Sequence, residues 1–190
     1  IDTLGDVVIP LKYDKASRFS EGLAAVREGR YWGYIDATGD YVIFPEFDAG
    51  YPFSEGFADV VCSRSRYFID RAGTPAFCDL VFNECNSFHD GYAGVKINGK
   101  WGFISKSGDI KINPVYDWVG NFSEGLAFVT LDIGKASCFG FVDSSGEMVI
   151  QPREYSMVSE FNKGIAWVMT GFPKCGYINR RGEYVWEPTQ

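Results

Sequence analysis

One short pattern recurs along this sequence, and it limits the possible folds more than any other feature. Phe19–Val26 (Phe-Ser-Glu-Gly-Leu-Ala-Ala-Val) returns four times, with steps of 34, 35, 34 and 39 residues between the leading phenylalanines. A second element follows it, clearest in Trp32–Gly39, which reads Trp-Gly-Tyr-Ile-Asp-Ala-Thr-Gly. A third element follows in Val42–Asp48, Val-Ile-Phe-Pro-Glu-Phe-Asp. Because the three elements keep a fixed order, the fold must be assembled from copies of one supersecondary unit.

The repeats account for the whole chain. The half that holds the second and third elements occurs six times, and the half that holds the first element occurs five times. The sequence therefore looks like a stretch of a longer array, or like an array with an extra half-repeat as a cap. We expect one domain, 1–190, that consists of the half-repeat 1–18 and the repeats 19–52, 53–87, 88–121, 122–160 and 161–190.

The residues between the turns favour strands over helices. Ile and Val number 29 against six Leu, and 17% of the chain is aromatic, which suits a pleated surface. Apolar residues alternate with period two, and each repeat shows three clear strands and a possible short fourth near Phe47–Phe53. The second and fourth positions of Leu23-Ala24-Ala25-Val26 are Ala and Val in every copy, which predicts a buried face. The third position varies and is occupied by Ala25, Asp59, Gly94, Phe128 and Trp167.

Two glycine positions carry structural expectations. Asp36-x-x-Gly39 is typical of a tight hairpin turn in which Asp caps backbone N–H groups and Gly takes a positive φ. The glycine after Trp, such as Gly33, is expected in mid-strand, where it allows a neighbouring aromatic to approach closely. Metal binding by the repeated aspartates is the alternative, but Ser105 and Asn179 replace them without a compensating ligand. The aspartates concerned are Asp36, Asp70 and Asp143.

These three linked motifs resemble the WG-repeat family of bacterial proteins, also called KWG repeats, over essentially the whole chain. The resemblance implies an all-β repeat architecture in which each repeat is a small antiparallel meander. It supplies no catalytic motif. About five such repeats fit either a propeller-like ring or an open β-spiral. We prefer the ring because closure removes exposed strand edges, although the surplus half-repeat fits the spiral better.

Composition and missing motifs narrow the function classes. A net charge of −7 argues against a nucleic-acid partner, and no apolar run is long enough to span a membrane. No phosphate-binding loop, dinucleotide fingerprint, serine-hydrolase elbow or zinc-ligand spacing is present, so we expect no cofactor, no metal and no catalysis. A Cys85–His89 pair requires the connecting loop to fold back. The five cysteines show no paired pattern and are expected to be mostly buried thiols, which favours the cytoplasm or another reducing compartment.

Binding residues are sought where the repeat is irregular. In the second repeat Arg66-Tyr67 replaces Trp-Gly, and Arg64 and Arg66 are expected to lie close together as a contact for a small anion or carboxylate. Drift in one repeat is the alternative. The turn residues Glu21, Glu55, Asp90, Glu124 and Lys163 are expected to form a solvated, mainly acidic rim rather than a site for a basic peptide or cations.

Variable aromatic residues are the second group of candidates, because Trp is enriched at binding hot spots. Phe128 and Trp167 are expected to lie side by side as an apolar strip, flanked by the longer hairpin tips 130–138 and 169–174. Packing between repeats is the alternative for each. The full set is Trp118, Phe128, Trp167, Phe172 and Trp186.

The sequence thus predicts a non-catalytic repeat module that binds a protein or a peptide. A structural spacer or accessory domain of a larger multidomain protein is the main alternative, and a glycan-binding or glycan-hydrolysing propeller is a further one.

Overall fold

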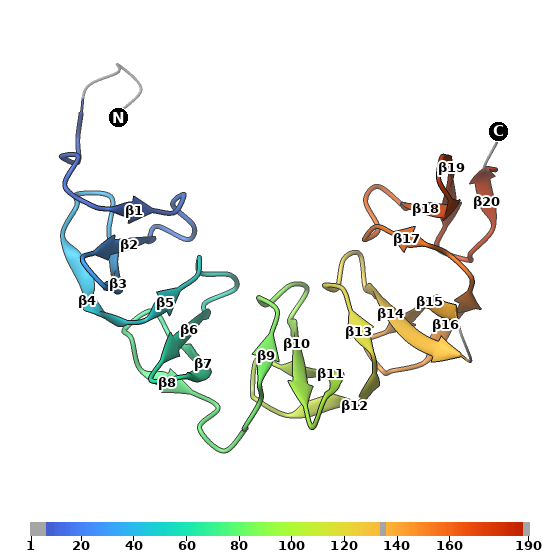
Figure 1. Ribbon diagram of the computed structural model, residues 1–190, viewed down its shortest axis with the longest axis horizontal. Helices are drawn as coiled ribbons and strands as arrows, with labels where there is room; N and C mark the ends of the chain where they lie inside the picture. Colours follow the sequence, from blue (N-terminus) through green and yellow to red (C-terminus); the bar gives the residue numbers. More distant parts are fainter. Residues whose placement is uncertain (1–6, 134–135, 188–190) are drawn as a thin grey trace. The chain divides into compact units, whose positions relative to one another are not determined.

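The computed structural model describes residues 7–133 and 136–187, and every regular element in these residues is a β-strand (Figure 1). The predicted all-β class is therefore confirmed. The chain divides into two compact units, 1–81 and 82–190.

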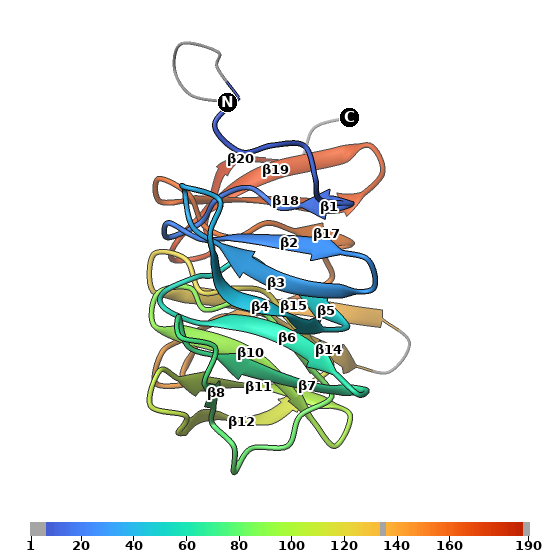
Figure 2. The same cartoon turned by 90° about the vertical axis from the view of Figure 1, so that its left-hand side faces the viewer.

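Each unit is built from four-stranded antiparallel sheets whose strands follow one another in chain order, and Figure 2 shows this order for β1 to β4. The first unit holds sheet 1, with β1 (Lys15–Ala16), β2 (Ala24–Glu28), β3 (Tyr31–Ile35) and β4 (Tyr41–Phe47), and sheet 2, with β5 (Ala49–Gly50), β6 (Ala58–Cys62), β7 (Ser65–Ile69) and β8 (Pro75–Ala76). The second unit begins with sheet 3, with β9 (Glu84–Cys85), β10 (Tyr92–Ile97), β11 (Lys100–Ser105) and β12 (Ile110–Tyr116). Sheet 4 comprises β13 (Trp118–Val119), β14 (Leu126–Ile133), β15 (Ala136–Asp143) and β16 (Met148–Arg153). Sheet 5 comprises β17 (Met157–Val158), β18 (Ile165–Gly171), β19 (Lys174–Asn179) and β20 (Tyr184–Trp186).

The sheets are out of phase with the sequence repeats. The expected short fourth strand exists as β5, inside the repeat 19–52, but it pairs with β6 of the following sheet. In the same way β1 comes from the half-repeat 1–18 and pairs with β2. Each sheet therefore begins just before a Phe-Ser-Glu-Gly segment rather than at it.

The Asp-x-x-Gly segments are the hairpin turns that the sequence predicts. Asp36 Oδ1 accepts hydrogen bonds from the backbone N–H groups of Thr38 and Asp40 at 2.9 and 3.2 Å, and Gly39 has a φ of +92°. Hydrogen bonds, above all that from the Thr38 hydroxyl, hold the pKa of Asp36 below its ordinary value. Asp70, Asp143 and Asn179 accept the corresponding backbone bonds. Turn formation therefore accounts for these aspartates.

The glycine after Trp serves a different purpose from the one expected. A Cβ atom on Gly102 would lie 2.4 Å from the carbonyl oxygen of Ile112 and 2.7 Å from the nitrogen of Pro114. The pairing of β11 with β12 shifts register at this point, so β12 bulges toward β11. The approaching group is thus the backbone of the next strand, and the expectation of an aromatic neighbour was wrong. Proline suits the bulge because it has no N–H group to leave unpaired.

Within each unit, successive sheets pack face to face. In the second strand of each sheet (β2, β6, β10, β14 and β18), the Ala and Val residues lie on one face and the alternate residues on the other. We call the face with Ala and Val the rear face, which within a unit packs on the preceding sheet. The opposite face is the forward face. Between sheets 4 and 5, Phe141 and Ile150 of one forward face pack against Ala166, Val168 and Ile178 of the next rear face. The predicted alanine burial is confirmed, with 0–2% exposure for Ala24, Ala58, Ala93, Ala127 and Ala166.

A buried aromatic pair recurs at these boundaries. At three boundaries within the units, the phenylalanine of the Phe-Ser-Glu-Gly turn meets, edge to face, the aromatic residue two positions after the Trp site of the preceding sheet. The ring centroids are 5.0 Å apart for Tyr34–Phe53, 4.8 Å for Phe103–Phe122 and 4.9 Å for Phe141–Phe161.

We expect Ala127→Leu to lower the free energy of unfolding by about 1–3 kcal/mol, because extra methylenes must enter a filled boundary between sheets 3 and 4. Ala16→Leu, on an exposed strand, is the matched control and should change it by less than about 0.5 kcal/mol. Denaturant unfolding measures both, and equal effects would show that the boundary is not tightly packed.

We expect Gly102→Ala to cost about 3 kcal/mol or more, because the new Cβ would overlap backbone atoms that cannot rotate away. In the control Gly29→Ala, the Cβ meets nothing within 4 Å but the residue has a φ of +61°, so only backbone strain of about 1–2 kcal/mol is expected. Thermal and denaturant unfolding compare the two; a smaller loss at Gly102 contradicts the role of the bulge.

Candidate functional site

The turn carboxylates link consecutive sheets and do not form a free acidic rim. Glu21 Oε2 accepts the backbone N–H of Gly56 at 2.9 Å, and Asp90 Oδ2 accepts that of Gly125 at 3.0 Å. Glu124 Oε2 accepts the N–H of Gly164 at 2.9 Å. Each bond joins a turn to the turn of the next sheet, so the expectation of carboxylates that are merely solvated was wrong at these positions.

The aspartate that ends the third element is also engaged. Asp48 Oδ2 accepts the N–H of Ser63, at the tip of the β6–β7 hairpin, at 2.9 Å, and Asp14 and Asp117 cap their own hairpins in the same way. Lys100 of the preceding sheet pairs with Asp117 at 2.5 Å. Its hydrogen bond is the main reason that the pKa of Asp117 lies below its ordinary value. The recurrent acidic residues thus support the scaffold.

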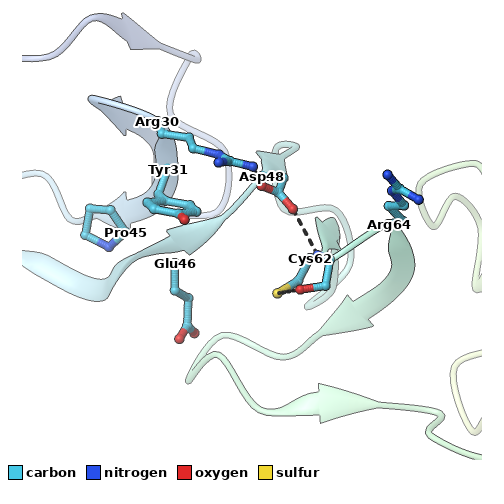
Figure 3. A pocket seen from close by; sticks show the side chains of 8 residues that line it. Arg30, Tyr31, Pro45, Glu46, Asp48, Cys62 and Arg64 are labelled. Atoms are coloured by element: carbon cyan, nitrogen blue, oxygen red, sulfur yellow. Dashed lines mark hydrogen bonds and ion pairs between the residues drawn. The ribbon is translucent and has the colours of Figure 1, made fainter.

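A shallow groove of about 770 Å³ lies on sheets 1 and 2 (Figure 3). Arg30 and Tyr31 line it from one hairpin, and Asp48 lies beside them at the end of β4. Arg30 pairs with Asp48 at 3.5 Å, and Figure 3 shows Arg64 directed away from both. Two of the charged side chains that line the groove are therefore paired with each other.

Arg64 and Arg66 do not form the expected anion contact. Arg64 is exposed at the hairpin tip with a φ of +71°, whereas Arg66 Nη1 donates to Asp59 Oδ2 at 3.1 Å. Arg66 Nη2 also donates to Tyr51 Oη at 3.1 Å, and its guanidinium lies 5.0 Å from the centre of that ring. Asp59 is only 4% exposed, and burial raises its pKa to about 6 although Arg66 opposes the shift. The irregular second repeat therefore contains an internal ion pair.

Phe128 and Trp167 are both half-buried, but they do not form one strip. Phe128 lies on the forward face of sheet 4 and packs against Phe139 and Phe141. Trp167 alternates with Ala166 and Val168, which face sheet 4, so its side chain lies on the opposite face of sheet 5. The expectation was wrong because successive sheets stack face to face and a whole sheet separates the two residues.

The other predicted aromatics occupy separate places. Trp118 is 47% exposed and packs edge to face on buried Trp101, with ring centroids 4.9 Å apart. Phe172 is 93% exposed at the tip of the β18–β19 hairpin. The longer tips are mainly extended strands, because β14 continues to Ile133 and β18 to Gly171.

The forward face of sheet 5 gathers three aromatics, Trp167, Tyr177 and Trp186, and we call it the end face. Tyr177 pairs across the strands with both tryptophans, and its ring stacks on that of Trp186 at 6.0 Å with an interplanar angle of 14°. Trp186 is 54% exposed, whereas Ile150, at the equivalent position of sheet 4, is 2% exposed. Among the described residues, the forward face of sheet 5 is thus less buried than that of sheet 4.

Tyr177 was missed in the sequence because it occupies a regular position of the Trp-Gly element. Regularity there indicates scaffold in every other repeat. The signal that identifies it is strand pairing: Tyr177 lies directly opposite Trp167, so both side chains must point to one face.

The structure separates Cys85 and His89, which the sequence suggested as a nucleophile and its base. Cys85 is buried opposite Val95, and exposed His89 lies opposite Tyr92, three residues along the same strand. Three residues of strand correspond to about 10 Å, so the two side chains do not form a pair. Among the described residues, no three His, Cys, Asp or Glu side chains lie close enough to share a metal ion. That part of the chain also contains no helix with the length and apolarity to cross a membrane.

The raised pKa of Asp59 predicts that folding stability depends on pH. Its pKa is higher in the folded protein, about 6, than the ordinary 3.8, so folding stability should rise as pH falls from about 7.5 to 4.5, by about 2 kcal/mol. Asp59→Asn should lack this rise. The exposed carboxylates with lowered pKa, such as Asp36 and Asp117, lose their contribution only below about pH 4, outside this window. Urea unfolding across the pH range measures the difference; equal slopes for the two proteins contradict it.

Comparisons with known structures show similarity of fold. Hsv2 of Kluyveromyces lactis, with its loop 6CD replaced by a Gly-Ser linker, superimposes with a TM-score of 0.61 at 10% identity, over 90% of this chain and 66% of that one. Apo AztD from Citrobacter koseri gives 0.53 at 12% identity, over 93% and 60%. The chain thus spans 60–66% of the length of these propeller-like proteins. The likeness supports a propeller-like stacking of sheets, and the preference for a closed ring stays a prediction.

Sequence comparison identifies the family. No curated protein matches the chain significantly. The model of the WG containing repeat matches five segments, residues 1–31, 32–62, 68–101, 101–132 and 139–171, which together include most of the sequence. The chain belongs to the WG containing repeat family.

Proposed function

We propose that this chain is a non-catalytic repeat module that binds a protein or a peptide through the end face. One observation carries the proposal: Trp167, Tyr177 and Trp186 share one sheet face, on which Trp186 is 54% exposed. Trp and Tyr combine a large apolar ring with one hydrogen-bonding group, and both are enriched at protein interfaces.

The contacts of the acidic residues support the same proposal. Glu21, Asp90 and Glu124 each accept backbone N–H groups from the next turn, and Asp48 and Asp117 cap hairpins. These carboxylates therefore stabilise the scaffold. The aromatic side chains at the surface, in contrast, vary from sheet to sheet. The net charge of −7 favours a protein partner over a nucleic acid.

A structural spacer is the second candidate, and the bonds between turns favour it. Regular links between consecutive sheets stiffen a repeat array and hold neighbouring domains apart. A spacer needs no aromatic end face, so the two candidates differ in what a substitution of Trp167 does.

The test is selection of peptides from a random phage-displayed library on the immobilised chain, followed by titration of the selected peptides. Trp167→Ala should raise their Kd at least about 30-fold, the equivalent of about 2 kcal/mol for a hot-spot residue. Phe44→Ala removes a 73% exposed aromatic from β4 and should leave the Kd unchanged. Circular dichroism and thermal unfolding confirm that both variants fold. Failure to select peptides, or equal effects of the two substitutions, favours the spacer.

A further inference from the structure

We infer that sheet 1 carries a binding site for a methylated ammonium group, formed by the rings of Tyr13 and Tyr41 and occupied in this structure by the side chain of Lys12. The site lies in the first unit, apart from the end face, and goes beyond the proposed function. Three observations carry it: the arrangement of the two rings, the cation that already lies on them, and the residues at the same positions of another sheet.

The two tyrosine rings stand nearly at a right angle. Their centroids are 6.1 Å apart, with an interplanar angle of 80°. The hydroxyl of Tyr13 donates to the carbonyl of Gly39 at 3.4 Å, and Tyr41 begins β4. Phe44 packs on Tyr41 with ring centroids 5.4 Å apart. Both rings are therefore held in place by the fold, which lowers the entropy that a ligand loses on binding.

The ammonium group of Lys12 lies over both rings. Its Nζ is 5.0 Å from the centre of the Tyr13 ring and 5.8 Å from that of Tyr41, within the range of a cation–π interaction. Within residues 7–133 and 136–187, no carboxylate forms an ion pair with Lys12, so the rings are its main partners. Lys12 is itself exposed, so water can take up its ammonium group when another cation enters.

A carboxylate lies beside the rings. Glu28 Oε2 accepts a hydrogen bond from the Tyr41 hydroxyl at 2.6 Å. Burial, followed by this bond, raises the pKa of Tyr41 above its ordinary value, so the phenol remains a neutral donor at neutral pH. A carboxylate next to electron-rich ring faces favours a ligand of positive charge.

The repeat does not require this combination of side chains. Three apolar residues take the same repeat positions between sheets 3 and 4: Val115 for Lys12, Leu131 for Glu28 and Met148 for Tyr41. Leu131 and Met148 pack there on the hydrophobic core, so an ordinary apolar contact fills the place. Val115 is 53% exposed although sheets 3, 4 and 5 are all present, so the same place is also open at an interior boundary of the array.

A methylated ammonium group fits the site better than the lysine that occupies it. A primary ammonium is strongly hydrated and must give up part of that hydration on a ring face. A quaternary ammonium has no N–H group to leave without water, and aromatic sites recognise it in choline and in methylated lysine. The ligand is therefore a quaternary ammonium group, either in a free small molecule or on a lysine of another protein.

The experiment titrates the chain with choline and follows binding by saturation-transfer NMR. Choline should bind with a millimolar Kd, and its uncharged analogue, in which tert-butyl replaces trimethylammonium, should bind at least about 5-fold more weakly because it lacks the charge. Lys12→Met removes the competing cation and should lower the Kd of choline at least about 3-fold. A gain of affinity cannot arise from a loss of folding.

Tyr41→Leu should raise the Kd of choline at least about 5-fold. Lys15→Met makes the same charge change on β1, and Tyr184→Leu makes the same ring deletion at the equivalent position of sheet 5; neither control should alter the Kd. Circular dichroism and thermal unfolding confirm that the variants fold.

A peptide with one trimethylated lysine distinguishes the two sources of the ligand. Tighter binding than choline identifies a protein as the source, and weaker binding identifies a free small molecule. Equal binding of choline and its uncharged analogue, no binding to either the native chain or Lys12→Met, or a Kd that Tyr41→Leu leaves unchanged would overturn the inference. The proposed function, which rests on sheet 5, would stand in each case.

Discussion

Within each unit, the contact between a turn phenylalanine and an aromatic ring of the preceding sheet is the interaction on which the packing of the sheets depends. A four-stranded meander of 5- to 8-residue strands and shorter pieces has two apolar faces and cannot bury both alone. The pairs Tyr34–Phe53, Phe103–Phe122 and Phe141–Phe161 fix how one sheet sits on the next, and the neighbouring Ala and Val residues then pack closely. Stability in such an array comes from boundaries between neighbours.

Polar groups complete the same boundary. The carboxylates of Glu21, Asp90 and Glu124 satisfy N–H groups of the next turn, where both central residues have positive φ and the backbone has few partners of its own. The glycine after Trp acts within a sheet, since it admits the bulge that carries the proline of the outer strand. Most of the recurrent glycines and acidic residues thus have structural roles.

The end face is the aromatic surface on which the proposed function rests. Tyr177, Asn162 and Lys163 occupy positions that receive a turn elsewhere in the array, and Trp167 and Trp186 enlarge the aromatic surface around them. Lys163 takes the place of a glutamate in its turn while the backbone geometry of the turn stays the same.

The sequence by itself determined the repeat, the strands, the Asp-x-x-Gly turns and the burial of residues such as Ala127 and Val129. All of these follow from local patterns: period two, turn chemistry and positions that recur in every copy. Only the tertiary structure decided that β5 joins the following sheet, that Glu124 caps the next turn, and that Phe128 and Trp167 lie on opposite sides of sheet 5. Local alternation shows that a strand has two faces, but which neighbour covers each face depends on how whole sheets stack.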